Sequence, residues 1–480
     1  MFWQGSSSAS EVASRSLLGK TIQREMGQEA IISIVLAAGA STRMKSSKSK
    51  LLHEVAGVSL ARRAWEQARV VSSEAPVFVL GHQRQEVEKE LNKFFGNEYM
   101  ACVQDPPRGT GDAVRIAVES IKKNNLKPKQ IFIMGGDACF VKPESLQAFR
   151  DDHINRKAVL SFLTAQLPDA HNYGRVVRNS QDAVEKIVEA KNASRVELQI
   201  NEINAGFYLV SWDALNEALA LVKPNEKSGE YYLTDIVEIL LRRQALVMGL
   251  RLGDWKESVG VNTQQDLAFA ERVLRDRIVD RWMSAGVQFQ DPTSVWISED
   301  TVLEADVYIA ANVHIQGACK ISRGTQVGAF CHIEDAQVGE KCQLGPFARI
   351  RPGSRLDQNV KIGNFVETKK SHFQKGSKAN HLSYIGDAEV GESSNIGAGT
   401  ITCNYDGIAK YQTEIGNNVF IGSNTALVAP VKIGAGAIVG AGSVITENVD
   451  PNSIALERSS QQKIKDGATR FREKRQKESK

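Results

Sequence analysis

The chain has 480 residues, of which 42% are hydrophobic, 24% charged and 7% aromatic, a globular composition that fits two to four domains. The formal net charge is +4, but the last eighteen residues carry eight Lys and Arg against three Asp and Glu, so the body of the chain is nearly neutral. The sequence has no apolar run of about eighteen residues and no basic patch interleaved with aromatic residues, which excludes a membrane-spanning helix and a protein built to read nucleic acid.

Both ends of the chain are predicted to lie outside the folded domains. Residues 1–30 are rich in Ser and have no sustained periodicity, which predicts a disordered extension, and Met26 is a candidate for an alternative start of translation. The basic tail is predicted to be solvated and disordered, with an anchor for nucleic acid or anionic lipid as the alternative. Six scattered Cys without C-x-x-C spacing, and no apolar secretion segment at the start, predict reduced thiols, no zinc site and a cytoplasmic protein.

From residue 31 onward, short apolar segments alternate with segments of helical periodicity. The pattern predicts strands over 31–37, 77–80, 101–104 and 130–134, and helices over 60–71, 86–95 and 111–121, followed by a helix that begins at Lys142-Pro143-Glu144. This alternation is typical of the α/β class, with a parallel sheet that is covered by helices on both faces. In such sheets ligands bind beyond the carboxyl ends of the strands.

Three polar loops that contain Gly follow predicted strands. Residues 36–50, LAAGASTRMKSSKSK, combine small residues with a run of cations, which suits the binding of phosphate groups, a solvated basic turn being the alternative. This loop has neither the G-x-G-x-x-G pattern of dinucleotide sites nor the G-x-x-x-x-G-K-[ST] pattern of a P-loop. In the second loop, Gly109-Thr110 either contacts a ligand or simply begins a helix. In the third, Asp137 either holds Mg²⁺ or caps a turn.

A long helical segment separates this region from the next. Residues 264–285, QQDLAFAERVLRDRIVDRWMSA, place apolar residues at roughly i, i+3 and i+4. The spacing predicts an amphipathic linker helix of about twenty residues that joins two domains.

Apolar residues then recur every six positions, and Gly follows many of them. The three runs are Ile309, Ile315, Ile321, Val327 and Ile333; Val338, Leu344, Ile350, Leu356 and Ile362; and Ile415, Ile421, Leu427, Ile433, Val439 and Ile445. A six-residue period of this kind predicts a parallel β-helix, in which each repeat forms one short strand and a tight turn. The period fails over 362–385 and 402–415, and both segments are predicted to leave the coil as loops.

The first of these breaks carries the candidate chemistry of the repeat domain. Its polar residues are Lys369, Lys370, His372, Lys375, Lys378, His381 and Tyr384. Cations beside an imidazole suit an anionic substrate and a general base. The residues alone do not choose between His372 and His381, because each is otherwise an ordinary surface histidine.

The three loops, taken in order, resemble those of nucleotidyltransferases that act on sugar phosphates. Residues 36–50 look like the signature L-A-A-G-x-G-T-R-M-x(5)-K, and further matches fall at Gln104, Gly109-Thr110, Gly136-Asp137, Tyr173-Gly174-Arg175, Val188-Glu189, Glu202-Ile203-Asn204, Gly229–Tyr232 and Gly260-Val261-Asn262. Together with the repeats, residues 31–458 are similar to the family of bacterial bifunctional N-acetylglucosamine-1-phosphate uridylyltransferase/glucosamine-1-phosphate acetyltransferases. The resemblance implies a Rossmann-like nucleotide-diphospho-sugar transferase domain over 31–262, a linker helix over 263–285, a left-handed parallel β-helix over 286–450 and a C-terminal segment over 451–480.

Within the first domain, the resemblance implies a site for UTP, Mg²⁺ and N-acetylglucosamine 1-phosphate. It assigns the nucleotide to Leu36, Ala37, Ala38, Gly39, Gln104, Gly109 and Thr110; the triphosphate charge to Arg43 and Lys50; Mg²⁺ to Asp137 and Asn262; and the sugar to Gly174, Glu189 and Asn204. The implied reaction is attack by a sugar 1-phosphate oxygen on the α-phosphorus of UTP with loss of pyrophosphate. Both reactants are anionic, so positioning and positive charge are needed rather than a covalent nucleophile.

Within the repeat domain, residues 363–370, 375–391 and 395–407 look like the acetyltransferase motif of the family, and His381 falls on its general base. The base would take a proton as the amine of glucosamine 1-phosphate attacks the thioester of acetyl-CoA. Family members are trimers with acetyl-transfer sites between subunits, so a homotrimer is implied. The resemblance assigns the sugar phosphate to Arg351, Lys369, Tyr384 and Asn395, and acetyl-CoA to Ala398, Asn404, Tyr405, Ser423, Ala441 and Arg458.

The implied function is the synthesis of UDP-N-acetylglucosamine, by acetyl transfer and then uridylyl transfer, for peptidoglycan and lipid A. Three departures bear on the second step, since Ser41, Ser49 and Gly135 stand where the family has Gly, Pro and an aromatic residue. Two alternatives are a nucleotidyltransferase for another sugar phosphate, which has no use for His381, and a repeat scaffold with a decayed uridylyltransferase site.

Overall fold

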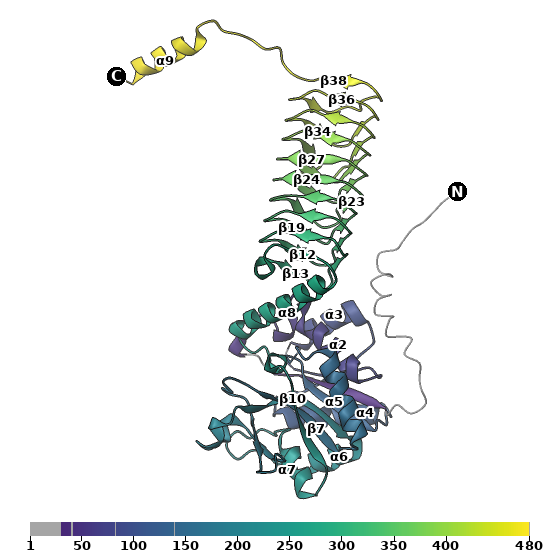
Figure 1. The fold of residues 1–480 in the computed structure, drawn as a ribbon, viewed down its shortest axis with the longest axis vertical. Coiled ribbons are helices and arrows are strands. Elements are labelled where there is room, and N and C mark those ends of the chain that lie inside the picture. Colours follow the sequence, from purple (N-terminus) through teal and green to yellow (C-terminus); the bar gives the residue numbers. More distant parts are fainter. Residues whose placement is uncertain (1–29, 40–41, 82, 139, 480) are drawn as a thin grey trace, which may run out of the picture. The chain divides into compact units, whose positions relative to one another are not determined.

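The computed structural model describes residues 30–39, 42–81, 83–138 and 140–479, shown in Figure 1. They form two compact units that divide between Glu271 and Arg272. The division falls inside the predicted linker helix, so this helix contributes residues to both units. The predicted extension over 1–30, with Met26, lies outside the described residues apart from Ala30, and so does Ser41.

The first unit is built on a nine-stranded sheet. The bounds of its strands are β1 Ile31–Ala37, β4 Val77–Leu80, β5 Met100–Val103, β6 Gln130–Gly135, β7 Leu160–Gln166, β8 Arg175–Arg178, β9 Val184–Val188, β10 Glu202–Ser211 and β11 Val247–Arg251. Seven of them follow in the order β11-β7-β10-β6-β1-β4-β5, and a hairpin of β8 and β9 pairs with β10. A separate ribbon joins β2 (Glu54–Val55) to β3 (Val58–Ser59). The four strands predicted from the sequence are β1, β4, β5 and β6, with bounds displaced by at most one residue.

Helices cover both faces of this sheet, as predicted. They are α2 Leu60–Val71, α3 Arg84–Phe95, α4 Thr110–Lys123, α5 Pro143–Asn155, α6 Trp212–Leu221 and α7 Asp235–Arg242, with short 3-10 helices η2 Thr42–Met44, η3 Lys50–Leu52, η4 Ala190–Asn192, η5 Glu197–Gln199 and η6 Trp255–Ser258. Alternate residues of a strand face opposite sides of a sheet. Ile32 and Ile34 of β1 lie in the apolar core with residues of α4, α6 and α7, whereas the hydroxyl of Ser33 donates to the Ala68 carbonyl of α2 at 2.9 Å.

The prediction of a parallel sheet is wrong in one respect, because β10 runs antiparallel to both β6 and β7. The other pairs of the seven-strand path are parallel. A strand can return beside its predecessor without a helical crossover only in the antiparallel sense. Here the chain forms the β8–β9 hairpin after β7 and then returns along β7 as β10, so no helix is needed between them.

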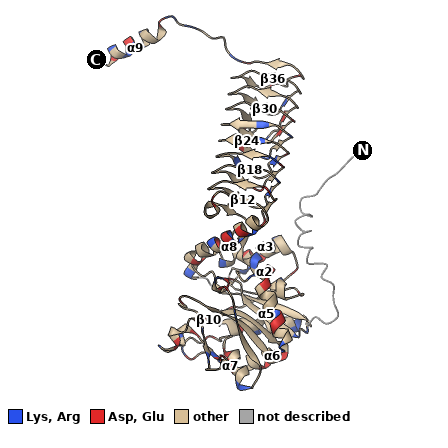
Figure 2. Ribbon diagram, viewed as in Figure 1, with Lys and Arg blue, Asp and Glu red and all other residues tan. Residues whose placement is uncertain are grey.

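The predicted linker helix is α8, Gln264–Ser284, which ends one residue earlier than predicted. Its first turn is closed by Asp266, whose carboxylate accepts from the amides of Asn262 and Thr263 at 3.0 and 2.9 Å. Such an acidic residue at a helix N-terminus satisfies amides that have no partner within the helix. Figure 2 shows acidic and basic residues side by side along α8.

The second unit consists of three parallel sheets of ten, nine and eight strands, which confirms the predicted parallel β-helix. The ten-stranded sheet contains β12 Gln288–Phe289, β15 Tyr308–Ile309, β18 Gln326–Val327, β21 Gln343–Leu344, β24 Lys361–Asn364, β27 Lys378–His381, β30 Asn395–Ile396, β33 Phe420–Ile421, β36 Ile438–Val439 and β38 Ile454–Ala455. The nine-stranded sheet contains β13 Trp296–Ile297, β16 His314–Gln316, β19 His332–Glu334, β22 Arg349–Ile350, β25 Glu367–Lys369, β28 Tyr384–Gly386, β31 Ile401–Cys403, β34 Ala426–Val428 and β37 Val444–Ile445. The eight-stranded sheet contains β14 Val302–Leu303, β17 Lys320–Ile321, β20 Gln337–Val338, β23 Arg355–Leu356, β26 His372–Phe373, β29 Ala388–Val390, β32 Thr413–Ile415 and β35 Val431–Ile433, and η7 spans Pro292–Ser294.

The first predicted break of the repeat is not a loop. Between Ile362 and Ile385 the coil continues, because Thr368, Phe373 and Ala379 fill the inward positions and are fully buried. Thr368 pairs with Ile350 on one side and with Ile385 on the other. The apolar pattern therefore missed positions at which a small, aromatic or hydroxyl side chain takes the place of Ile, Leu or Val.

The second predicted break does leave the coil. After β31 the chain forms a short excursion closed by an isolated bridge between Tyr405 and Lys410, and it rejoins the coil at β32. Its tip is solvated, since Ile408 is 93% exposed.

The basic tail is solvated as predicted, but it is not without structure. Residues Gly467–Glu478 form the helix α9, which has no buried residue. Its Arg and Lys residues are good helix formers, which accounts for helix in a segment with no buried residue. Among the described residues, no helix combines the length and the apolar character needed to cross a membrane.

Candidate functional site

The carboxyl ends of β1 and β6 bring the cationic loop and the acidic turn together. Lys50 donates from Nζ to Asp137 Oδ2 at 2.6 Å and to Asn262 Oδ1 at 3.1 Å. Arg43 donates to the same oxygen of Asn262 at 3.0 Å. The side chains of Lys50 and Asp137 are only 16% and 23% exposed, so solvent screens this ion pair less than one on the open surface. Four residues from three loops thus form one polar centre.

The donors of this centre fit the implied metal. Asp137 and Asn262 each direct one oxygen at a single ammonium, and oxygen ligands of this kind are the ones that Mg²⁺ prefers. The backbone fixes the acidic turn, because the amide of Val261 donates to the Asp137 carbonyl at 3.1 Å. A Cβ on Gly260 would lie 3.6 Å from Asp137 Oδ2, so this loop packs directly against the carboxylate.

Tyr173 connects the polar centre with the residues assigned to the sugar. Its hydroxyl accepts a hydrogen bond from the amide of Gly260 at 3.2 Å. Burial raises the pKa of Tyr173, and the nearby carboxylates of Asp137 and Asp266 act in the same direction. The phenol therefore stays protonated at neutral pH and keeps its O–H as a donor.

A cavity of about 820 Å³ opens beside the first loop. Its lining residues include Ala38, Gly81, Gln83, Arg84, Val103, Gln104 and Asp105. A smaller cavity of about 150 Å³ is lined by Ala37, Ala38, Gly39 and Ser49 among others. The structure therefore brings Ala38 of the first loop and Gln104 of the second to one cavity, whereas Leu36, Gly109 and Thr110 are not among the described residues that line either cavity.

Sequence reasoning missed two residues of this cleft, Gly81 and Gln83. A Cβ on Gly81 would lie 2.3 Å from the carbonyl oxygen of Ala38, so only Gly fits. Gln83 donates from Nε2 to the Ser47 carbonyl at 2.8 Å and thereby ties the cationic loop to the turn after β4. The sequence did contain a signal for Gly81, because this glycine directly follows the strand predicted over 77–80. That strand, β4, pairs with β1.

The second loop does more than begin a helix. Gln104 donates from Nε2 to the Gly109 carbonyl at 3.0 Å and to Asp112 Oδ2 at 2.9 Å. Gly109 has φ +99°, and a Cβ there would lie 2.5 Å from the carbonyl oxygen of Tyr231. Thr110 Oγ1 accepts from the amide of Leu233 at 3.0 Å. The loop is thus fixed on both sides while Gln104 lines the cleft.

The three residues assigned to the sugar lie together. The amide of Asn204 donates to the Gly174 carbonyl at 2.9 Å, and a Cβ on Gly174 would lie 3.6 Å from Glu189 Oε2. Thr234 donates from Oγ1 to Glu189 Oε1 at 3.1 Å. Burial raises the pKa of Glu189, and this hydrogen bond opposes the rise. These residues form a half-buried polar surface with amide and carboxylate groups, which suits hydroxyl and acetamido groups of a sugar; we call this surface the sugar pocket.

In the second unit, predicted residues form a column along the corner that follows the ten-stranded sheet. Backbone hydrogen bonds join successive coils at this corner. The four amide-to-carbonyl pairs are Leu382 to Asn364, Gly399 to His381, Asn424 to Ala398, and Gly442 to Ser423. Arg458 donates to the Ala441 carbonyl at 3.3 Å. Residues 381, 398, 423 and 441 are therefore consecutive levels of one column, and the side chain of Arg458 reaches the last of them. Five of the residues assigned to acetyl transfer share this corner.

The structure distinguishes the two candidate histidines. The ring of His381 is exposed, and its Nδ1 lies 2.9 Å from Asn364 Oδ1. The Asn oxygen can only accept, so Nδ1 carries the proton and Nε2 has a free lone pair. In His372 both ring nitrogens face carboxylates, Nδ1 at 3.0 Å from Glu389 and Nε2 at 3.0 Å from Asp357. Only His381 presents a free nitrogen to a substrate.

The predicted sugar-phosphate cations lie at the corner that follows the nine-stranded sheet. The amide of Arg351 donates to Thr368, one coil away, which places Arg351 and Lys369 at neighbouring levels. The cations of Lys410 and Arg351 lower the pKa of Lys369, so three positive charges gather here. Lys410 was missed from the sequence because it lies in the excursion after β31, and its contact with Lys369 depends on the path of that loop. Two carboxylates lie among these cations, since Glu367 pairs with Arg351 at 2.7 Å and Asp387 acts on Lys369, so the three cations exceed the carboxylates by one charge. An excess of positive charge suits an anion.

Lys410→Ala should therefore raise the KM for glucosamine 1-phosphate by about tenfold or more, because one charged contact to a phosphate is worth about 1.5–3 kcal/mol. The KM for acetyl-CoA should change less than twofold. Steady-state kinetics of CoA release against each substrate would measure both values, with the exposed Lys432→Ala as a control. An unchanged KM for the sugar phosphate would exclude Lys410 from the site.

The other residues assigned to acetyl transfer do not all join the column. Asn404 Nδ2 donates to Asp387 Oδ2 at 2.5 Å, beside the cations. Tyr405 lies in the excursion and its hydroxyl donates to the Gly407 carbonyl. Asn395 pairs in register with Lys378, and Tyr384 pairs with Glu367. Within one chain the assigned residues thus divide between two corners of the β-helix.

The fold and these sites define the class of protein. The first unit matches the nucleotidyl transferase family model over residues 32–276, and part of the second matches the bacterial transferase hexapeptide model, with six repeats, over 412–447. The chain is therefore a transferase that joins a nucleotidyltransferase domain to a hexapeptide-repeat domain.

Close relatives identify the family. The bifunctional protein GlmU of Streptococcus uberis (strain ATCC BAA-854 / 0140J) is 43% identical over 455 residues, which cover 90% of this chain and 96% of that protein. The protein of the same name from Heliobacterium modesticaldum (strain ATCC 51547 / Ice1) is 41% identical over 449 residues, with coverage of 90% and 96%. The chain belongs to this GlmU family of uridylyltransferase/acetyltransferases, and it is a bifunctional enzyme of UDP-N-acetylglucosamine biosynthesis.

Proposed function

We propose that the first unit transfers a uridylyl group from UTP to N-acetylglucosamine 1-phosphate at the centre formed by Arg43, Lys50, Asp137 and Asn262. The convergence of these four residues, with Lys50 in contact with both oxygen donors, carries the proposal. The cleft beside Ala38 and Gln104 receives the nucleotide, and the pocket of Gly174, Glu189 and Asn204 receives the sugar. The 1-phosphate oxygen attacks the α-phosphorus of UTP, and pyrophosphate leaves.

Asp137 and Asn262 would hold Mg²⁺, which when bound neutralises phosphate charge. Lys50 and Arg43 would then turn from these donors to the triphosphate, where their charges oppose the repulsion between two anionic reactants. The carboxylate and the amide keep their positions because the backbone of Asp137 is fixed by Val261 and that of Asn262 by Asp266.

The second unit transfers an acetyl group from acetyl-CoA to the amine of glucosamine 1-phosphate. Asn364 holds the Nδ1–H of His381, and the free Nε2 takes a proton from the amine as its nitrogen attacks the thioester carbon. Arg351, Lys369 and Lys410 bind the phosphate. The corner column of Ala398, Ser423, Ala441 and Arg458 binds the CoA chain, and CoA leaves as the thiol.

The enzyme works as a homotrimer, in the cytoplasm. Two observations support a trimer: the acetyl-transfer residues divide between two corners, and an exposed stripe lies beside the His381 column. In this stripe the rings of Phe330, Phe347 and Phe365 stack at 4.9 and 5.2 Å, and the three residues are 44–55% exposed. A contiguous exposed apolar stripe marks an interaction surface. A partner subunit at this corner would cover the stripe and bring the second half of a site to His381.

Light scattering of the purified chain should therefore give three times the chain mass of 52.7 kDa. Phe347→Asp should shift the protein towards the monomer and lower acetyl transfer, because it places a charge in the covered stripe. Full activity of a strictly monomeric protein would contradict sites shared between subunits.

The most direct test of the function is mass spectrometry of the products formed from glucosamine 1-phosphate, acetyl-CoA and UTP with Mg²⁺. The expected product is UDP-N-acetylglucosamine. Accumulation of N-acetylglucosamine 1-phosphate alone would show that the departures at Ser49 and Gly135 abolish the second step. A UDP-sugar formed only from another sugar phosphate would overturn the assignment of N-acetylglucosamine 1-phosphate as the substrate.

A further inference from the structure

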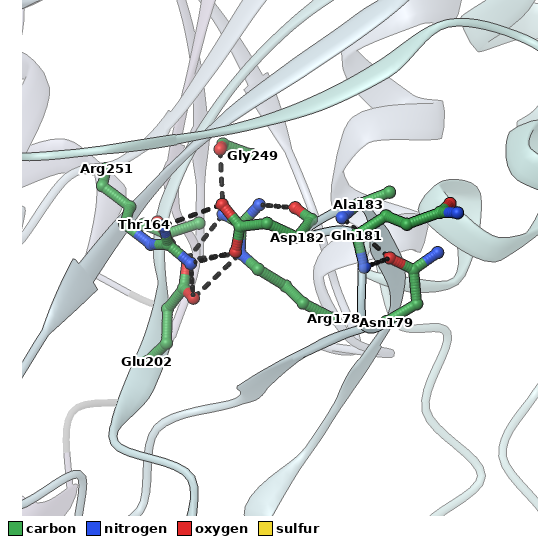
Figure 3. A network of polar contacts seen from close by, with 9 residues as sticks. All are labelled: Thr164, Arg178, Asn179, Gln181, Asp182, Ala183, Glu202, Gly249 and Arg251. Carbon is green, nitrogen blue, oxygen red and sulfur yellow. Dashed lines mark hydrogen bonds and ion pairs between the residues drawn. The ribbon is translucent and has the colours of Figure 1, made fainter.

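The β8–β9 hairpin carries a cluster of charges that no step above uses (Figure 3). Two arginines, Arg178 and Arg251, converge on the carboxylate of Glu202. The contacts to Glu202 are Arg178 Nη2 at 2.6 Å, Arg178 Nε at 2.9 Å, Arg251 Nη2 at 3.0 Å and Thr164 Oγ1 at 2.7 Å. Arg251 also binds both carboxylate oxygens of Asp182, at 2.7 and 3.0 Å. The cluster thus connects the β8–β9 turn with β7, β8, β10 and β11.

The core of this cluster is buried and balanced in charge. The side chains of Glu202 and Arg178 are 7% and 12% exposed. Burial alone would raise the pKa of Glu202, but hydrogen bonds from Arg178, Arg251 and Thr164 outweigh it and lower the pKa. The carboxylate is therefore charged, and removal of one partner leaves a buried charge without compensation.

The hairpin depends on side chains for its place in the sheet. The strand β8 meets β10 through one register pair, Ile203 with Arg175, whereas β10 and β7 share six. Arg178 supplies the missing attachment, because it binds Glu202, the Gly249 carbonyl at 2.9 Å and the Asp182 carbonyl at 2.9 Å. Apart from these bonds, the turn end of the hairpin is held by Val184, which is buried in the apolar core.

The other end of the hairpin carries the sugar pocket. Gly174 directly precedes β8, and Glu189 directly follows β9. Glu202 lies two residues before Asn204 on β10, so both side chains project from the same face of the sheet. A displacement at Glu202 is thus passed to all three residues assigned to the sugar, by way of the hairpin and by way of β10.

We propose that Arg178, Glu202 and Arg251 are positioning residues that set the geometry of the sugar pocket, and through it the affinity for the sugar phosphate. The inference rests on the proposed uridylyl transfer at this unit. None of the three touches the polar centre of Lys50 or the nucleotide cleft among the contacts of the described residues. Their effect should therefore be selective for one of the two substrates.

The test is the steady-state kinetics of pyrophosphate release by the full-length enzyme with Mg²⁺. Glu202→Gln keeps the shape of the side chain and removes its charge, so the KM for N-acetylglucosamine 1-phosphate should rise about tenfold or more while the KM for UTP changes less than twofold. Arg251→Lys keeps a cation, so its KM for N-acetylglucosamine 1-phosphate should lie between those of the wild type and Arg251→Gln. A purely structural loss would lower the amount of active enzyme and leave both KM values unchanged.

The chain supplies its own controls. Glu217→Gln removes an exposed ion pair of the same unit and should leave both KM values unchanged. CoA release by the second unit reports whether each variant is folded and present in the expected amount. If Glu202→Gln does not fold, the same two KM values are measured for Arg251→Gln. This variant keeps the buried Arg178–Glu202 ion pair and should fold. Equal changes in the two KM values, or none, would overturn the positioning role. A wild-type enzyme that releases no pyrophosphate would instead overturn the proposed function.

Discussion

Lys50→Ala should abolish pyrophosphate release from UTP while CoA release continues at the wild-type rate. The substitution removes an ammonium that faces both Asp137 and Asn262, at the proposed site of the triphosphate. Loss of one such electrostatic group lowers kcat by about 10²–10³-fold, which is roughly 3–4 kcal/mol of transition-state stabilisation. A coupled phosphate assay and a thiol assay on one preparation would measure both reactions.

The matched control is Lys45→Ala, which removes an exposed cation from the same loop. If the two variants lose uridylyl transfer equally, the general positive charge of the loop matters and the position of Lys50 does not. Lys50→Arg is a further check, since it keeps the charge but replaces a compact ammonium by a planar fork. We expect it to recover only part of the rate.

His381→Ala should produce the reverse pattern, with loss of CoA release and normal pyrophosphate release from supplied N-acetylglucosamine 1-phosphate. A positioned general base contributes about 10²–10⁴-fold, so kcat for acetyl transfer should fall within that range. The KM for acetyl-CoA should change little, because the column that we propose for its binding continues beyond His381. Separate assays with each acceptor would measure the two steps.

Two companion variants locate the base. His372→Gln should leave acetyl transfer intact, since both nitrogens of His372 are taken up by carboxylates. Asn364→Ala should lower kcat by a smaller factor than His381→Ala, because the ring loses its orientation but keeps its free nitrogen. If His372→Gln abolished CoA release and His381→Ala did not, the assignment of the base would be wrong.

Much of the architecture could be predicted from the sequence, because each unit has a strong periodicity. Strand–helix alternation gave β1, β4, β5 and β6 almost to the residue, and the six-residue period gave the β-helix. The direction of β10 could not be predicted, since it depends on the hairpin that precedes it rather than on its own residues. The continued coil through Thr368 and Phe373 was missed for a different reason. Thr368 is not apolar, and Phe373 follows it after five residues rather than six, but stacking holds both side chains inward.

The residues of the candidate sites also divide into those that could be predicted from the sequence and those that were missed. Residues inside recognisable motifs, such as Lys50, Asp137 and His381, could be named from the sequence. Gly81 and Lys410 were missed, because their neighbours Ala38 and Lys369 are about forty residues away along the chain. The cluster around Glu202 is a further case, in which four strands must be assembled before the partners of the charge are known.

The corner column of the β-helix behaves as a molecular ruler. Successive levels of a β-structure are about 4.8 Å apart, so the three steps from His381 to Ala441, which Arg458 contacts, span about 14 Å. Deletion of one complete coil between these residues would preserve the stacked core yet shorten the ruler by one level. The protein would fold, but a thioester presented from a fixed anchor at Arg458 would overshoot His381. Under the proposed acetyl transfer, the number of coils, and not only the identity of the base, would therefore set the length of the acyl carrier that this enzyme accepts.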